Sequence, residues 1–211
     1  MQSDQQLQCL VRVVDDDPNV RRSWQFVLEG EGWHVRCYEN AVAFLLADDS
    51  SIPGCLVLDV RMPQMSGIEL QNEMRLQDNR LPIVFISAHG DIDMAVKAVK
   101  DGAFDFLPKP VQTERLIATV EKAVEKDLKE RLERQAIDKA LAAFESLSVR
   151  EKEVAEGVAQ GLLNKQIAFN LNITEKTVIA HRGSLCKKLG VRTGADITRI
   201  LMIVEQSRAK K

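Results

Sequence analysis

The stretch Cys55-Leu56-Val57-Leu58-Asp59-Val60-Arg61-Met62-Pro63-Gln64-Met65-Ser66-Gly67 decides the fold. It begins with four apolar or small residues that run directly into one aspartate, as in a buried strand of a parallel sheet. Pro63 and Gly67 then mark an irregular segment before a helical pattern. Asp59 is therefore predicted at the carboxyl end of a strand, the edge where open α/β sheets bind ligands. A strand-end aspartate considered alone is more readily explained by helix capping or a loop, so other residues must decide.

Length and composition limit the possible classes of protein. A chain of 211 residues is typical of two modest domains. No run approaches ~18 apolar residues, so no membrane-spanning helix is expected. The first eight residues lack the hydrophobic core of a signal peptide, which predicts a cytoplasmic protein without membrane contact. Four scattered cysteines without a C-x-x-C pair, and only three histidines, argue against a structural zinc site or a disulfide framework.

Charge is distributed unevenly along the chain. Residues 1–112 carry 10 Lys and Arg against 17 Asp and Glu, whereas residues 146–211 carry 12 against 6. The segment between them is nearly balanced, with 7 against 8. An acidic front and a basic end indicate two different roles, the second with a polyanion as partner.

Short strands are predicted to alternate with helices through residue 112. Asp17 and Pro18 suit the start of the first helix, Asn40 the second and Asp91 the fourth. The alternation predicts an α/β fold, a flavodoxin-like, doubly wound, five-stranded parallel sheet with helices on both faces. The strands are expected at residues 10–14, 33–37, 55–59, 82–87 and 103–107, with the second at an edge.

Polar residues follow directly on several predicted strand ends. Carboxylates gathered there would repel each other unless a cation is present, and oxygen ligands of this kind suit Mg²⁺. A carboxylate can attack phosphorus to give an acyl phosphate, whose oxygens an ammonium and a hydroxyl can bind. Because the carboxyl ends of parallel strands share one edge, we expect these side chains to lie together: Asp15, Asp16, Asp59, Ser87 and Lys109.

The segments around these residues resemble receiver domains of two-component response regulators. They are Asp15-Asp16, L-D-V-R-M-P-Q-M-S-G at 58–67, I-S-A-H-G-D at 86–91 and L-P-K-P at 107–110. The resemblance covers residues 9–125 and implies that Asp59 accepts a phosphoryl group from a sensor histidine kinase, with Ser87 and Lys109 assisting. It also implies Mg²⁺ bound by Asp16, Asp59 and the backbone carbonyl of Arg61, with Asp15 acting through water.

The same resemblance implies a switch pair, Ser87 and Phe106, and a cis bond between Lys109 and Pro110. Two alternatives remain from the residues alone, a solvated Asp15 without a ligand role and a Phe106 that only fills the core. His89 is interpreted as a loop residue without a catalytic role.

The segment that follows is predicted to be one long helix. Gly and Pro are absent from Val111 to Ala155, strong helix formers dominate, and opposite charges recur three or four residues apart. We expect the helix to begin at Thr113 and to continue to about Phe144, with residues 126–145 as a linker. Its apolar residues recur every fourth position, which favours a charged helix with a thin apolar stripe over a regular coiled coil.

Residues 146–211 carry the pattern of an all-α, four-helix, helix-turn-helix domain. Ser148 and Glu151 form the sequence of a capping box. Asn164 and Thr174 are predicted to cap the second and third helices. Two short helices joined by a tight turn, the second one basic, indicate DNA binding.

The third of these helices places small and apolar residues at the centre of its exposed face. Ile179 and Ala180 suit contact with thymine methyl groups, while the surrounding lysines would position the helix on phosphates without reading sequence. A solvated basic face is the alternative for each lysine, and packing against the second helix is the alternative for His181. The residues predicted to face DNA are Lys165, Lys176, Thr177, Ile179, Ala180, His181, Arg182, Gly183, Lys187, Lys188 and Arg192.

Three segments of this domain resemble the LuxR-type DNA-binding domain. They are L-S-V-R-E-K-E-V at 147–154, N-K-Q-I-A at 164–168 and T-E-K-T-V-I-A-H-R at 174–182. The whole chain thus resembles response regulators of the FixJ/NarL type. The resemblance implies a transcription factor that dimerises on phosphorylation and binds double-stranded DNA, with RNA polymerase as a further partner.

Two other functions compete with this interpretation. An aspartyl phosphatase or phosphotransferase typically needs a second carboxylate two residues past the nucleophile, but Arg61 occupies that position. An enzyme is therefore not expected. A constitutive DNA-binding protein could use the first domain for dimerisation alone, but the acidic set together with Lys109 argues against it.

Overall fold

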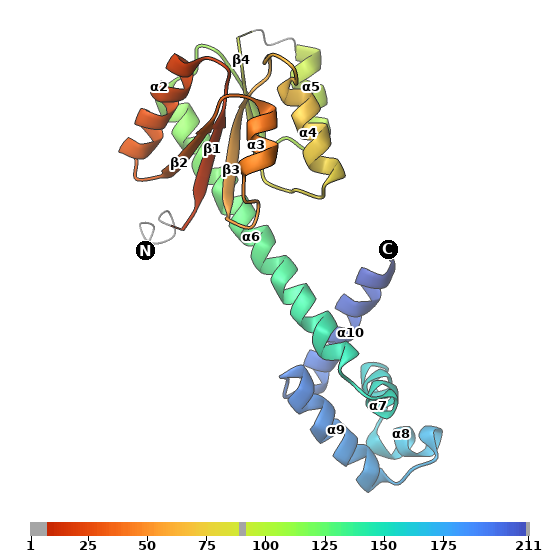
Figure 1. Cartoon of the computed structure of the whole chain (residues 1–211). Coiled ribbons are helices and arrows are strands. Elements are labelled where there is room, and N and C mark those ends of the chain that lie inside the picture. Colours follow the sequence, from red (N-terminus) through yellow and green to blue (C-terminus); the bar gives the residue numbers. More distant parts are fainter. Residues whose placement is uncertain (1–7, 89–91, 210–211) are drawn as a thin grey trace. The chain divides into compact units, whose positions relative to one another are not determined.

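The computed structural model describes residues 8–88 and 92–209 (Figure 1). The chain divides into two compact units, Met1–Glu130 and Arg131–Lys211. His89 and the predicted Asp91 cap lie outside the described residues. Within the described ranges, no helix is both long enough and apolar enough to cross a membrane.

The first unit contains a five-stranded sheet with the strand order β2-β1-β3-β4-β5, and every neighbouring pair is parallel. The predicted α/β sheet is confirmed, including β2 at an edge. The strands are β1 (Leu10–Val14), β2 (His34–Tyr38), β3 (Gly54–Asp59), β4 (Ile83–Ser87) and β5 (Asp105–Pro108), and the helices are α2 (Pro18–Gly30), α3 (Ala41–Ala47), α4 (Gly67–Leu76), α5 (Ile92–Lys100) and α6 (Thr113–Glu145).

Alternate residues of each strand enter two separate hydrophobic layers, because side chains of a strand point to opposite faces in turn. Leu56 and Leu58 of β3 pack with α3, α4 and α5 on one face. Cys55 and Val57 pack with α2 and α6 on the other. Figure 1 shows these helices on the two faces. The central strands are buried throughout, which explains their continuous apolar sequence.

Local sequence signals set most helix ends in this unit. Asp17 and Asn40 accept hydrogen bonds from backbone N–H groups of α2 and α3, as predicted, and Pro18 is the first residue of α2. A capping box of Ser66 and Glu69, which sequence reasoning missed, begins α4.

The fifth strand begins two residues later than predicted. Its apolar pattern starts at Ala103, but the N–H of Ala103 bonds to the carbonyl of Ala98 and therefore belongs to the end of α5. Gly102 makes this turn with a φ of 102°, a region that favours glycine. The strand proper starts at Asp105.

The long helix is confirmed. Helix α6 contains 33 residues from Thr113 to Glu145, so it begins in the first unit and continues into the second without a break. Its sequence contains neither of the two residues, Gly and Pro, that most often end helices.

The second unit adds four shorter helices around one hydrophobic core. The Ser148–Glu151 capping box and the Thr174 cap are confirmed. The core includes Phe144 at the end of α6, which is 3% exposed. The helices are α7 (Val149–Ala159), α8 (Asn164–Leu171), α9 (Glu175–Leu189) and α10 (Gly194–Ala209).

The predicted Asn164 cap was wrong. Leu163 occupies the cap position of α8, and Gln166 accepts the hydrogen bond from its N–H at 2.8 Å. Asn164 is the first residue of the helix, and its side-chain oxygen accepts a 2.6 Å hydrogen bond from Arg182 instead. A tertiary contact therefore replaces the local cap that sequence alone suggested.

Candidate functional site

The strand register brings two predicted acidic residues together with a lysine. Val14 pairs with Leu58, so Asp15, directly after β1, and Asp59, the last residue of β3, lie at the same edge of the sheet. Lys109 follows β5, and its ammonium donates to Asp59 Oδ1 at 2.7 Å and to Asp15 Oδ2 at 3.1 Å. The Asp15 and Asp59 side chains are only 5% and 9% exposed. Three residues far apart in sequence thus form one nearly buried cluster, as predicted.

Backbone groups hold both carboxylates in place. The N–H of Arg61 donates to Asp59 Oδ2 at 2.7 Å, and the N–H of Asp17 donates to Asp15 Oδ1 at 2.9 Å. Sequence reasoning missed Arg21, whose guanidinium donates to the carbonyls of Asp15 and Asp16 at 2.6 and 3.0 Å. It lies six residues past Asp15, on the first turn of α2, where a basic side chain can reach back to this loop.

The protonation of the cluster reflects burial and charge together. Burial raises the pKa of Asp15, although the N–H of Asp17 and the charge of Lys109 oppose this change. Burial alone would lower the pKa of Lys109, but the hydrogen bond to Asp59 and the charges of both carboxylates more than offset it, so that pKa is raised. The lysine is thereby kept as the cation between two acids.

Asp16, the third predicted acid, has an exposed side chain. Among the residues that the structure describes, no three acidic, histidine or cysteine side chains are grouped as metal ligands. The donor chemistry nevertheless fits Mg²⁺, because carboxylate and carbonyl oxygens at one strand edge are the ligands this ion prefers. Asp15 and Asp59 lie together at this edge through Lys109, whereas Asp16 is exposed.

Ser87 and Phe106 lie on the neighbouring strands β4 and β5, beside this cluster. Ser87 is the last residue of β4 and is 2% exposed, and its carbonyl accepts the N–H of Lys109 at 2.7 Å. Phe106 is buried in β5, with its ring centroid 6.0 Å from that of Phe85. The predicted cis bond between Lys109 and Pro110 is confirmed.

Gly67 closes the loop that follows Asp59, and only glycine fits there. A Cβ atom at this position would lie 2.3 Å from the carbonyl oxygen of Asp59 and 3.1 Å from the ring of Phe85. The N–H of Gly67 also bonds to the carbonyl of Val60 at 3.0 Å. This glycine therefore lets α4 begin directly against the strand that carries Asp59.

The second unit presents the predicted DNA-facing helix, α9. Its buried side consists of Val178, Leu185 and Leu189, as its spacing predicts. Of the predicted DNA-facing residues, Lys165, Lys176, Ile179, Ala180, Gly183, Lys187, Lys188 and Arg192 are exposed, whereas Thr177, His181 and Arg182 are half-buried.

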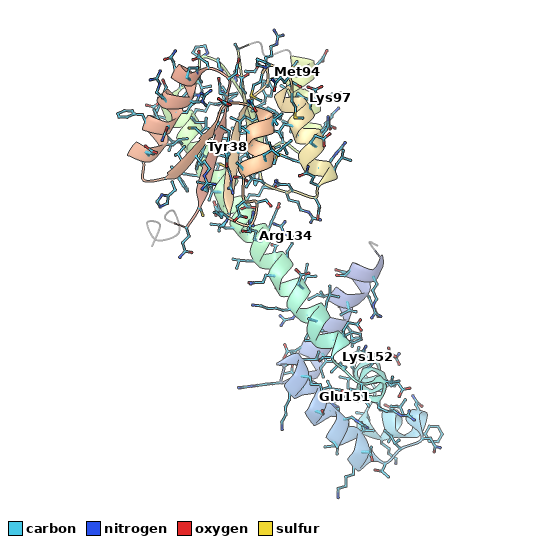
Figure 2. All side chains as sticks on the ribbon, viewed as in Figure 1. Tyr38, Met94, Lys97, Arg134, Glu151 and Lys152 are labelled. Carbon is cyan, nitrogen blue, oxygen red and sulfur yellow. The ribbon has the colours of Figure 1, made fainter. Side chains whose placement is uncertain are left out.

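Glu151, which Figure 2 labels, attaches α7 to α9, a role that its place in the capping box did not reveal. Its carboxylate accepts the N–H of Ser148 at 2.7 Å, the hydroxyl of Ser184 at 2.6 Å and the ammonium of Lys188 at 2.7 Å. The hydrogen bonds of Lys188 and then Ser184 lower the pKa of Glu151 to about 2. Lys188, predicted to contact phosphate, thus already has a carboxylate partner.

Arg182 makes a second attachment of α9. It donates to Asn164 at the start of α8, and it lies 3.9 Å from where a Cβ of Gly194 would be, at the start of α10. Two of the predicted DNA-facing residues, Arg182 and Lys188, therefore hold the helix within its own domain. The other exposed residues surround the small side chains at its centre.

Comparison with known families matches both halves of the chain. Residues 11–121 match the response regulator receiver domain, and residues 145–201 match the LuxR family of bacterial regulatory proteins. The chain is 41% identical to the response regulator protein TmoT of Ectopseudomonas mendocina, covering 90% of this chain and 87% of that protein. It is 38% identical to the transcriptional regulatory protein FixJ of Bradyrhizobium diazoefficiens, covering 91% and 94%.

Two solved structures of response regulators match most of the length of the chain. The response regulator StyR matches with a TM-score of 0.86 and 42% identity, covering 92% of this chain and 98% of that one. Full-length FixJ from B. japonicum matches with a TM-score of 0.57 and 35% identity, covering 94% and 98%. Receiver domains of this family generally use Mg²⁺ for phosphorylation. The chain belongs to the transcriptional response regulators of two-component systems, with a receiver domain and a LuxR-type DNA-binding domain.

Proposed function

We propose that Asp59 is the residue that accepts a phosphoryl group from a sensor histidine kinase. The observation that carries this assignment is the ammonium of Lys109, bonded to Asp59 at 2.7 Å and to Asp15 at 3.1 Å. It supplies a cation where the oxygens of an incoming phosphoryl group would need one. The N–H of Arg61 orients the same carboxylate.

The reaction is an attack of an Asp59 oxygen on the phosphorus of a phosphohistidine. A P–O bond forms, the P–N bond breaks, and the imidazole leaves with the bonding electron pair and takes up a proton. Lys109 then binds a phosphoryl oxygen, and the Ser87 hydroxyl at the neighbouring strand end donates to another. Arg61 stands where aspartyl phosphatases and phosphotransferases carry a second carboxylate, so we infer a regulator rather than an enzyme.

Asp16, Asp59 and the carbonyl of Arg61 are the residues that would hold Mg²⁺, with Asp15 acting through water. When bound, Mg²⁺ supplies positive charge against the phosphoryl oxygens. Arg21 fixes the backbone of both Asp15 and Asp16, which keeps the acidic loop in position for this set.

Labelling with a small phosphodonor such as acetyl phosphate tests the assignment. The wild-type chain should be labelled in the presence of Mg²⁺, and Asp59→Asn should remain unlabelled. Asp78→Asn makes the same change at an Asp whose side chain is 78% exposed, and it should label as the wild type does. Labelling that persists in Asp59→Asn overturns the site.

Phosphorylation is proposed to act through Ser87 and Phe106 on the surface of α5, β5 and the start of α6, and thereby to favour a homodimer. Two LuxR-type units would then bind two half-sites of double-stranded DNA, with RNA polymerase as a further partner. The proposed domains are residues 9–125, 126–145 and 146–211, and the family matches to residues 11–121 and 145–201 support this division.

The DNA-facing surface is proposed to centre on α9. Ile179 and Ala180 would contact bases, while Lys176 and Lys187 would contact phosphates. Their exposure supports this role. Lys165, Gly183 and Arg192 belong to the same surface by their exposure, and Thr177 and His181 remain predicted members at its border.

A further inference from the structure

A fully buried carboxylate lies in the linker helix. Asp127 is 0% exposed, although its neighbours Glu125 and Lys126 are exposed, as expected for a charged helix. Its Oδ2 atom accepts the backbone N–H of Gly54, the first residue of β3, at 2.9 Å. Burial of a charge is costly unless hydrogen bonds satisfy it, and retained buried charges are best known for fixing the register of packed elements.

The backbone conformation and the close surroundings of Gly54 require a glycine at this contact. Its φ of 151° favours glycine, and a Cβ atom would lie 1.9 Å from the carbonyl oxygen of Leu10 and 3.0 Å from the guanidinium of Arg12. Arg12 is itself fully buried and donates to Asp48 at 2.9 Å and to three backbone carbonyls. The amide that Asp127 bonds to therefore lies among close backbone and side-chain contacts at the amino end of the sheet.

The apolar part of the contact between α6 and the sheet does not by itself select one register. Leu116, Val120 and Val124 are buried and repeat every four residues, and Leu128 continues the series. Apolar contact is not directional, so a slip of four residues, about 6 Å, would exchange one member of the series for the next. Asp127 lies beside this series, four residues past the buried Ala123, and a slip would separate it from Gly54.

We propose that Asp127 is a positioning residue that fixes the register of α6 on β3 and thereby couples the receiver to the DNA-binding domain. This inference rests on the proposed function, because it requires that Asp59 respond to phosphate. The strand β3 connects the two points directly, with Gly54 at its first residue and Asp59 at its last. The helix α6 continues unbroken to Glu145, and its Phe144 is buried in the core of the second unit.

The test compares three variants of the full chain. Asp127→Leu removes the acceptor but keeps a residue of similar volume suited to the apolar stripe, and Asp127→Asn keeps an acceptor for the N–H of Gly54. Glu125→Leu is the matched control, since it introduces the same side chain two residues away on the exposed face of the helix. The DNA probe is a duplex selected from a random-sequence pool with the phosphorylated wild-type protein.

Two quantities are measured for each variant, the rate of labelling by acetyl phosphate and the ratio of the DNA Kd without and with beryllium fluoride and Mg²⁺. Asp127→Leu should label at the wild-type rate, while its Kd ratio falls about fivefold or more. Asp127→Asn and Glu125→Leu should keep both quantities. A purely structural role would lower labelling together with the ratio.

Several outcomes overturn the proposal. The first is a Kd ratio in Asp127→Leu that equals that of the wild type. The second is a Kd ratio that falls in Asp127→Asn as much as in Asp127→Leu, and the third is a lower labelling rate in Asp127→Leu. Should Asp127→Leu fail to fold, Asp127→Glu replaces it in the test, because it displaces the acceptor by one methylene. A Kd ratio in Asp127→Glu equal to that of the wild type would then overturn the proposal. A wild-type ratio of one would overturn the proposed function and this inference together, whereas a preserved ratio in Asp127→Leu overturns this inference alone.

Discussion

The Nζ atom of Lys109 lies 2.7 Å from Oδ1 of Asp59, although fifty residues separate them in sequence. The same ammonium reaches Asp15 at 3.1 Å. Removing it leaves two nearly buried carboxylates at one strand edge without their shared cation. Lys109→Ala should therefore lower the free energy of unfolding of the receiver by about 2 kcal/mol, because the two carboxylates would repel each other and water could not solvate them fully. Urea unfolding measures this change.

A second substitution checks the cause of that loss. Asp15→Asn in the Lys109→Ala background removes one of the two like charges and should recover part of the stability. Loss of packing alone would leave the double variant no more stable than Lys109→Ala. Labelling by acetyl phosphate should fall in both variants, since neither retains the ammonium beside Asp59.

Gly67→Ala should destabilise the receiver by about 1–3 kcal/mol, the usual cost of overpacking. The added Cβ would lie 2.3 Å from the backbone oxygen of Asp59, which cannot move without distorting the strand end. Gly183→Ala is the contrasting change, because nothing lies within 4 Å of a Cβ in the middle of α9. It should raise the stability of the second unit by up to about 1 kcal/mol through helix propensity. Equal effects on thermal unfolding would contradict this steric explanation.

The sheet and the cluster at its edge could be predicted from the sequence because their signals are local. Apolar runs that end in polar residues define the strands, and parallel strands gather their carboxyl ends at one edge. These two rules are sufficient to place Asp15, Asp59 and Lys109 together. The caps at Asp17 and Ser148 were predictable for the same reason, since each acts within a few residues of itself.

Contacts between distant elements were not predictable. Asp127 has the sequence surroundings of a solvated helix face, and only the packing of α6 shows that it is buried. Asn164 has the sequence of a cap, yet it bonds to Arg182 on another helix. Lys188 has the pattern of a phosphate contact, but its partner is Glu151, 37 residues away. In each case a tertiary contact outweighed a local preference. Such a contact joins residues far apart in the chain, so the residues near each position do not reveal it.

The stability of the second unit should depend on pH through Glu151. Its pKa is lowered to about 2 in the folded state, below the ordinary value near 4.5, by the hydrogen bonds from Lys188 and Ser184. As pH falls, the unfolded chain takes up the proton first, so the stabilisation present above pH 4.5 is lost between about pH 4.5 and 2. The thermal midpoint of the second unit should therefore fall over this range.

Glu151→Gln isolates that contribution. It keeps the shape of the side chain and a hydrogen-bonding oxygen, but it cannot titrate. The difference in melting temperature between wild type and variant should be largest near neutral pH and should shrink toward pH 2. A difference that stays constant over this range would show that titration of Glu151 does not stabilise the fold.

Lys187 and Lys188 are neighbours in sequence with different expected roles in DNA binding. Lys187 is exposed on the proposed DNA-facing side of α9, whereas the ammonium of Lys188 bonds to Glu151 at 2.7 Å. A phosphate contact releases counterions, so Lys187→Ala should reduce the slope of log Kd against log salt by about 0.9 for each bound subunit. Lys188→Ala should leave that slope unchanged but should lower the melting temperature, because Glu151 loses its cation. The reverse pattern, in which only Lys188→Ala changes the slope, would assign the phosphate contact to Lys188. The bond between Lys188 and Glu151 would then belong to the DNA-free protein alone.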